Sequence, residues 1–247
     1  MMETRIEDLR NLTDAPDADA VVVIDVLRAF STAAVALDRG AVGIYPVLDV
    51  AEAFERRARE PDLVLMGETD CRPVPGFDLG NSPVAAAAFP FSGRRAVQRT
   101  TAGTRGLVCC RDARLLMAAS FLVGSATADA LRAAGCKRAA FVITGTVHYG
   151  SADEDLACAE WMAELLRGNR PPVEPFLRRI RESVAAATFL DPASPLHAPA
   201  DVGFCARADV FAFAMQAEAG PGSLVLRRGR QIIPKTAIEP KSRRTFA

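Results

Sequence analysis

The stretch 67-GETDCRPVPGFDLGNSP-83 decides the predicted fold, because it joins a buried strand to a helix through one long loop. The apolar run Leu63 to Met66 precedes it, and Asn81, Ser82 and Pro83 close it as a cap followed by proline at the first helical position. Parallel α/β sheets keep their chemistry in the loops that follow the strands, so this acidic, glycine-containing loop is a candidate site. An ordinary surface loop with turn residues fits the same stretch equally well.

Apolar runs and helical periodicity continue to alternate on both sides of this loop. Glycines and prolines separate the elements, and no repeat, low-complexity tract or linker divides the chain. Strands that alternate with helices predict a three-layer α/β/α fold with a largely parallel or mixed sheet, as one domain over residues 1–247 or as two closely packed halves. The expected strands are Val21–Ile24, Val42–Val47, Leu63–Met66, Arg94–Arg99, Leu115–Phe121 and Ala139–Thr144. The expected helices include Val50–Arg59, Pro83–Phe89, Thr127–Ala134, Asp153–Arg167 and Pro175–Ala187, and a hairpin is expected to pair Leu224–Arg228 with Arg230–Ile233.

Composition narrows the class of protein. Of the 247 residues, 50% are hydrophobic and 24% are charged, which is typical of a globular protein with a large core. The 30 basic and 30 acidic residues balance, and no basic block carries aromatic residues, so we expect no nucleic-acid partner. No apolar run is long enough to cross a bilayer and the first residues are too acidic for a signal peptide, so we expect a cytoplasmic protein without a membrane partner. The six cysteines form no C-x-x-C pair, which argues against a zinc site or a disulfide framework.

Asp25 directly follows the first core strand and is a candidate catalytic residue. A side chain at a strand end is held rigidly, as proton transfer or nucleophilic attack requires. A helix cap is the alternative role for Asp25. Arg28 stands in the first turn of the next helix, where it either binds an anion or lies in solvent.

The run Thr100 to Gly106, TTAGTRG, lies between an expected strand and a helix. Hydroxyls and glycines in such a turn can present a nest of backbone N–H groups to an anion, with Arg105 adding a bidentate charge. The run lacks the G-K-[ST] ending of a Walker loop, and a turn that binds no ligand is the alternative.

Acidic residues also open the helix that starts at Asp153. Asp153, Glu154 and Asp155 complement the helix dipole, which by itself explains them, so a metal or catalytic role needs outside support. On the same helix Cys158 is a nucleophile candidate, although a cysteine within a helix is more often buried and inert. His148, in the preceding loop, is a candidate for titration near neutral pH.

Five stretches together resemble the magnesium-dependent 2-phosphosulfolactate phosphatases of coenzyme M biosynthesis. They are IDVLRAFSTA at 24–33, GE at 67–68 with GFDLGNSP at 76–83, TTAGTRG at 100–106, EDLACA at 154–159 and DVGFCARAD at 201–209. They keep the family's order, and GFDLGNSP is the most specific. The resemblance implies an α/β/α enzyme that uses Mg²⁺ to hydrolyse the phosphate monoester of a small sulfonated or carboxylated acid, 2-phosphosulfolactate or a related compound.

Matching the family residue by residue implies where the chemistry lies, and we expect the matched residues to converge at one end of the sheet. By this match the catalytic residues are Asp25, Arg28 and Cys158, the metal ligands are Glu68, Asp78, Glu154 and Asp155, and the phosphate- or substrate-binding residues are Asn81, Ser82, Thr100, Thr101, Gly103, Thr104 and Arg105. These acids outnumber the one or two carboxylates that Mg²⁺ usually takes, so some must have another role. Asp25 is the leading acid/base or nucleophile candidate, and both covalent attack and water activation stay open.

Three positions depart from the family's usual pattern. Ala102 replaces the asparagine of T-T-N-G-T, Thr69 the arginine of G-E-R, and Ala152 the serine of F-S-L-E-D. These changes support a second hypothesis, a phosphate- or sulfonate-binding protein on the same scaffold without turnover. Cysteine-based chemistry through Cys158 and Cys205 is a third. Enzymes of this size are commonly homo-oligomers, so a homodimer is the expected state.

Overall fold

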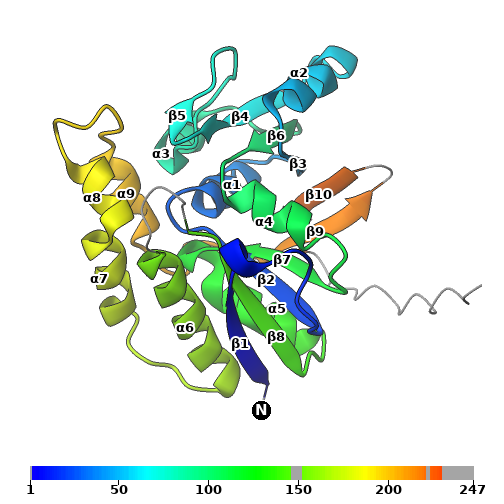
Figure 1. Ribbon diagram of the computed structural model, residues 1–247. Helices are drawn as coiled ribbons and strands as arrows, with labels where there is room; N and C mark the ends of the chain where they lie inside the picture. The colour runs from blue at the N-terminus through cyan, green and yellow to red at the C-terminus, as the bar shows by residue number, and fades with distance from the viewer. Residues whose placement is uncertain (1, 146–151, 221–222, 230–247) are drawn as a thin grey trace, which may run out of the picture.

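The computed structural model describes residues 2–145, 152–220 and 223–229, and over these ranges ten strands form one sheet with nine α-helices packed around it (Figure 1). The strands are β1 (Glu3–Asp8), β2 (Ala20–Ile24), β3 (Gly43–Val47), β4 (Val64–Thr69), β5 (Arg72–Pro73), β6 (Arg95–Arg99), β7 (Leu116–Ala119), β8 (Arg138–Ile143), β9 (Met215–Gly220) and β10 (Ser223–Arg228). The helices are α1 (Ala29–Asp38), α2 (Val50–Arg59), α3 (Pro83–Ala88), α4 (Gly103–Cys109), α5 (Gly124–Ala133), α6 (Asp153–Arg167), α7 (Glu174–Glu182), α8 (Val184–Leu190) and α9 (Pro199–Cys205). The predicted α/β class with a mixed, largely parallel sheet is confirmed.

The sheet consists of two parallel groups of strands joined by an antiparallel hairpin. The strand order is β1-β8-β2-β7-β9-β10-β3-β6-β4-β5. β1, β8, β2 and β7 are parallel to one another, as are β3, β6 and β4, and the β9–β10 hairpin pairs antiparallel with β7 on one side and β3 on the other. Because three antiparallel pairings lie between the groups, the strands of one group run against those of the other.

Burial along the central strands explains their sequences. Every residue of β2 and of β7 is buried, so both faces of the sheet are covered there, and such strands have continuous apolar runs in place of alternation. Helix α1 is buried from Ala29 to Leu37, as expected for a helix that is apolar on all sides. The end of β2 and the start of α1 are therefore held in the interior.

Two sequence-based expectations about the helices and strands need correction. The helix expected over Pro175–Ala187 is wrong, because the backbone at Ser183 is extended (φ −69°, ψ 154°) and separates α7 from α8, with the Ser183 Oγ accepting a hydrogen bond from Ala186 N. The expected hairpin is also wrong, since β10 pairs with the preceding strand β9 and with β3. Its other expected arm, 230–233, and His148 lie outside the described residues. Strand β1 and helix α9 were not predicted.

The structure bears on one further expectation. No helix in the described part of the chain is both long enough and apolar enough to cross a membrane.

Candidate functional site

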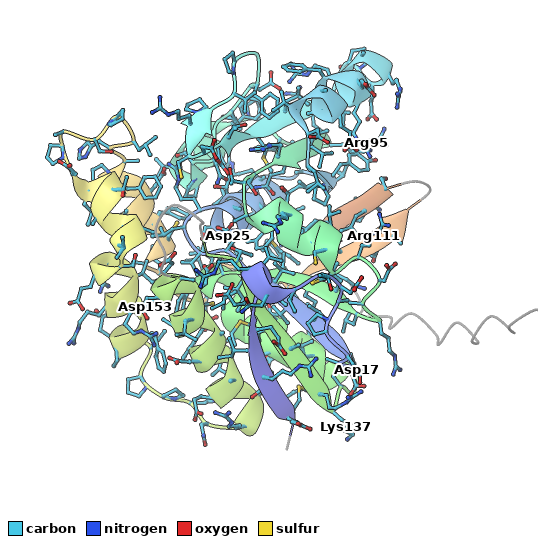
Figure 2. All side chains as sticks on the ribbon, in the orientation of Figure 1. Asp17, Asp25, Arg95, Arg111, Lys137 and Asp153 are labelled. Atoms are coloured by element: carbon cyan, nitrogen blue, oxygen red, sulfur yellow. The ribbon has the colours of Figure 1, made fainter. Side chains whose placement is uncertain are left out.

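A small buried cavity brings together residues from both strand groups. Its volume is about 30 Å³, and side chains after β2, in β4 and after β6 form its acidic and polar wall. In Figure 2, Asp25 lies in the interior, far from the labelled surface residues Asp17 and Lys137. The residues lining the cavity are Asp25, Leu27, Arg28, Glu68, Asp70, Cys71, Asn81, Thr101, Ala102 and Phe189. The site thus lies between two strand groups that run in opposite directions. The expectation that the site residues converge at one end of the sheet is therefore wrong.

Asp25 both binds the start of the next helix and lines the cavity. Its Oδ1 accepts a hydrogen bond from Ala29 N (2.9 Å) at the start of α1, and the side chain also lines the cavity. Gly103 permits the close approach of α4, since a Cβ there would lie 2.8 Å from both Asp25 Oδ2 and Ala29 Cβ. Gly103 therefore has a packing role beside Asp25 and does not itself line the cavity.

Glu68 organises the opposite wall. Its Oε2 accepts hydrogen bonds from Cys71 N (2.6 Å) and Thr101 Oγ1 (3.0 Å), and its Oε1 accepts one from Thr101 N. The preceding Gly67 has φ +134° and a Cβ there would lie 1.8 Å from Arg99 O, so only glycine fits between β4 and β6. Glu68 thereby fixes the position of the turn after β6.

The threonine-rich turn is closed mainly by its own hydrogen bonds. Thr104 N donates to Thr100 Oγ1 and Thr100 N donates to Thr104 Oγ1, both at 3.0 Å, and both side chains are buried. Thr101 N is taken by Glu68, so two of the expected N–H donors of an anion nest are already occupied. Arg105 is exposed on α4 and does not line the cavity. Of this motif, Thr101 and Ala102 reach the cavity.

Asp155 connects the ends of β2 and β8. Its Oδ1 accepts a hydrogen bond from Val26 N (2.8 Å), and its Oδ2 accepts from Thr144 N (3.2 Å) and Gly145 N (3.1 Å). The neighbouring Glu154 is also buried, but its Oε2 has no hydrogen-bond partner among the described residues. Because buried polar atoms are almost always partnered, Glu154 Oε2 is a candidate ligand atom.

Three buried carboxylates raise one another's pKa. Burial, reinforced by Asp155, raises the pKa of Asp25 to about 7. Burial raises the pKa of Glu154 to about 7 as well, with Asp25 adding to the effect, and the pKa of Asp155 likewise rises to about 7 through burial and the charge of Glu154. A concentration of negative charge of this kind is a frequent mark of a functional site.

Arg28 supplies the positive charge of the cavity, since it alone is cationic among the described residues that line it. Its Nη1 donates to Asp201 Oδ2 (2.8 Å), and its Cζ lies 4.3 Å from the centre of the Phe189 ring. Ser82 Oγ donates to Asp201 Oδ1 (2.6 Å) and accepts from Ala85 N as the N-cap of α3. Ser82 therefore does not line the cavity itself but binds Asp201, which in turn binds Arg28.

Asn81 and Asp78, from the same motif, occupy different environments. Asn81 lines the cavity, and its buried Oδ1 has no hydrogen-bond partner in the part of the chain that the structure describes. Asp78 Oδ2 accepts hydrogen bonds from Leu65 N (2.8 Å) and Arg57, and Asp78 does not line the cavity. The structure thus brings Asn81 to the site and gives Asp78 a role in joining β4 to α2.

Cys158 is deeply buried on α6. Burial, with the nearby Asp155 carboxylate, raises the pKa of this thiol well above its ordinary value. A thiol protonated at neutral pH is a poor nucleophile, which argues against cysteine chemistry at this position. Cys205 is similar, because burial raises its pKa to about 12.

The chemistry of these side chains fits a small hard cation. Across residues 2–145, 152–220 and 223–229, no three His, Cys, Asp or Glu side chains already converge as a cation site. Mg²⁺, however, keeps several waters and takes only one or two protein carboxylates. Glu68 lines the cavity, and Glu154, which does not line it, has an oxygen without a partner among the described residues, so these two carboxylates are the candidate ligands.

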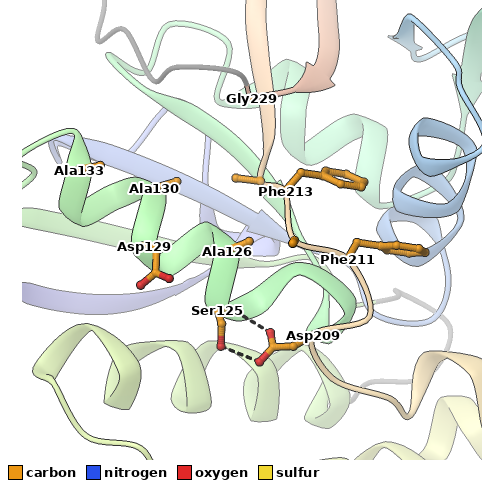
Figure 3. A pocket seen from close by; sticks show the side chains of 11 residues that line it. Ser125, Ala126, Asp129, Ala130, Ala133, Asp209, Phe211, Phe213 and Gly229 are labelled. Atoms are coloured by element: carbon orange, nitrogen blue, oxygen red, sulfur yellow. Dashed lines mark hydrogen bonds between the residues drawn. The ribbon is translucent and has the colours of Figure 1, made fainter.

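A larger and more open groove lies elsewhere, between α5 and the segment that leads into β9 (Figure 3). Its volume is about 760 Å³, and alanines of α5 face Phe211 and Phe213 across it. The carboxylate of Asp209 in its wall is bound by the backbone N–H and the hydroxyl of Ser125. The groove does not combine a cation with several acids as the small cavity does, so the small cavity is the candidate functional site.

Fold and cavity together define an α/β protein with a buried pocket in which acidic side chains face one arginine. The family model for 2-phosphosulpholactate phosphatase matches residues 5–219, and the chain belongs to this family. A probable 2-phosphosulfolactate phosphatase of Bacillus subtilis is 33% identical over 194 residues, which cover 77% of this chain and 83% of that protein. Proteins with the same description from Carboxydothermus hydrogenoformans and Thermus thermophilus are 42% and 38% identical, over 51% and 64% of this chain and 50% and 65% of their own lengths.

The residues Leu27, Asp70, Cys71 and Phe189 line the cavity but were not among the predicted site residues, and neither was Asp201, which lies outside the lining. Phe189 lies under Arg28, and Asp201 binds it from α9. Asp201 opens the stretch DVGFCARAD, which was recognised as similar to the family without a role for any of its residues. That stretch was the feature of the sequence that could have pointed to Asp201, whereas no feature of the sequence pointed to Phe189.

Proposed function

We propose that the chain is a Mg²⁺-dependent phosphatase that hydrolyses the phosphate monoester of a small sulfonated or carboxylated acid, 2-phosphosulfolactate or a related compound. The observation that carries this proposal is the cavity in which Asp25 and Glu68 face Arg28. Hydrolysis of a monoester requires a bound dianion, a positioned nucleophile and a proton for the leaving alkoxide. The family membership of the chain and the descriptions of its relatives support the same substrate class.

Each requirement has a proposed residue. Glu68 and Glu154 would hold Mg²⁺, which when bound neutralises charge on the phosphoryl oxygens. Arg28 binds the phosphate through the N–H groups that Asp201 leaves free, and Asn81 contacts the substrate. Asp78 and Asp155 are not included, because neither lines the cavity and neither has a buried oxygen without a hydrogen-bond partner among the described residues.

Asp25 is the proposed acid/base or nucleophile. A pKa of about 7 suits a group that must both take and give a proton near neutral pH. In the reaction the bond from phosphorus to the alcohol oxygen breaks, water supplies the oxygen that joins phosphorus, and one proton passes to the alkoxide. Asp25 either accepts the proton from that water or attacks phosphorus first.

Phosphate release from a panel of small monoesters, including 2-phosphosulfolactate, tests this proposal. We expect release that requires Mg²⁺, stops on chelation and is lost in Asp25→Asn. Asp153→Asn is the control for this change, because Asp153 does not line the cavity and pairs with Arg179. Stabilisation by phosphate without any hydrolysis would support the non-catalytic binding protein instead. The cytoplasmic location and the homodimer stay predictions.

A further inference from the structure

We propose that Asp201 is a positioning residue that holds Arg28 in its anion-binding place and away from the acids of the cavity. The inference rests on the proposed function and makes α8 and α9 a determinant of substrate affinity. Asp201 lies 173 positions from Arg28 in the chain, and its contact with Arg28 exists only in the folded protein.

The ion pair is well buried. The Arg28 and Asp201 side chains are 10% and 4% exposed, and the Arg28 guanidinium also lies over the Phe189 ring. Phe189 belongs to a small apolar cluster with Ala186 and Val202, against which Leu27 packs. Little water competes for these charges, so the direction of the guanidinium is set by Asp201 and Phe189 together.

The same carboxylate also binds the start of α3, next to another residue of the cavity. Asp201 Oδ1 accepts hydrogen bonds from Ser82 Oγ (2.6 Å) and Val84 N (3.3 Å) at the start of α3. Asn81, which lines the cavity, directly precedes Ser82. One buried carboxylate therefore sets the positions of both Arg28 and Asn81.

The acids of the cavity make this anchor necessary. Asp25 and Glu68 line the same small space as Arg28 and attract a guanidinium that is not otherwise bound. An Arg28 side chain that turned toward them would occupy the carboxylate proposed to hold Mg²⁺ and would leave the phosphate unpaired. Asp201 uses one of the five guanidinium N–H groups and leaves the others for a substrate anion.

Kinetics and inorganic phosphate binding by the full-length protein test the inference. Asp201→Asn keeps the size of the side chain but removes its charge, and we expect about tenfold weaker phosphate binding and a similar rise in KM, with a smaller change in kcat. We expect the double variant with Arg28→Lys to be no weaker than Arg28→Lys alone, because both changes remove one interaction. Glu160→Gln is the control, since Glu160 pairs with Arg179, neither residue lines the cavity, and the change should leave KM unchanged.

Two results would overturn the inference. One is an unchanged phosphate affinity and KM in folded Asp201→Asn. The other is a double variant whose loss of phosphate affinity equals the product of the losses in the two single variants. If Asp201→Asn does not fold, Phe189→Leu removes the ring under Arg28 and keeps the ion pair, and an unchanged phosphate affinity in that variant would equally refute it. Phosphate binding is measured without turnover, so a wild-type protein that binds phosphate but hydrolyses no ester would contradict the proposed function alone.

Discussion

Replacing Asp25 by asparagine is expected to abolish catalysis and to make the metal-free protein more stable above neutral pH. In the folded protein burial and Asp155 raise the pKa of Asp25 from 3.8 to about 7, whereas the unfolded chain ionises near the lower value. As pH rises between these values, the unfolded chain loses a proton that the folded protein keeps, so folding becomes less favourable. The penalty is complete above the folded pKa and absent below the unfolded one.

The magnitude follows from the two pKa values. Each pKa unit corresponds to about 1.4 kcal/mol, so a rise from 3.8 to about 7 amounts to about 4 kcal/mol at about pH 8 and about 1.5 kcal/mol at about pH 5. Asparagine avoids this penalty but accepts a weaker hydrogen bond from Ala29 N, which costs about 1 kcal/mol. The net gain in the free energy of unfolding is therefore about 2 to 3 kcal/mol at the higher pH and close to zero at the lower one.

Urea unfolding of both proteins in chelator, at about pH 8 and about pH 5, measures this difference. The control is Asp78→Asn, because the Asp78 carboxylate is stabilised by Leu65 N and Arg57, and its loss should destabilise the protein by about 1 kcal/mol at both pH values. The reasoning is refuted if Asp25→Asn is less stable than the wild type at the higher pH, or if its advantage does not shrink on acidification.

Three shorter predictions address the metal, the thiol and the packing of α4. Mg²⁺ should raise the melting temperature of the wild type more than that of Asp25→Asn. An equal rise in both proteins would show that the ion binds independently of Asp25. In a phosphate-release assay, the turnover of Cys158→Ala should stay within about threefold of the wild-type value, because the buried thiol stays protonated. Loss of activity in a folded variant would support the hypothesis that Cys158 is a nucleophile. Gly103→Ala should lower kcat and destabilise by about 1 to 3 kcal/mol, since its Cβ would lie 2.8 Å from Asp25 Oδ2. Gly203→Ala, with open space around it, should do neither.

The parts of the site that follow strands were predictable from local sequence. Asp25 directly follows an apolar run and Glu68 stands just after another, so their places at strand ends followed from hydrophobicity and turn residues alone. The cap at Ser82 was equally local, and its Oγ does accept from Ala85 N.

The remaining features depend on contacts between distant segments. The motif around Asp78 predicted that this carboxylate lies at the site. The Asp78 side chain instead points toward Arg57, and the packing of α2 sets this direction. The strand β9, Met215–Gly220, consists largely of alanine, glutamate and glycine, which are uncommon in strands, and its pairing with β7 stabilises it. The partnership of Arg28 with Asp201 likewise exists only after α9 has packed against α3.

The late position of the β9–β10 hairpin in the chain has a consequence for synthesis on the ribosome. Every other strand precedes Met215, so both parallel groups can form while the facing edges of β7 and β3 still lack their partners. Unpaired strand edges associate readily with other chains. The nascent protein is therefore most prone to aggregation just before residues 215–228 emerge, and the arrival of this one hairpin protects both edges at once.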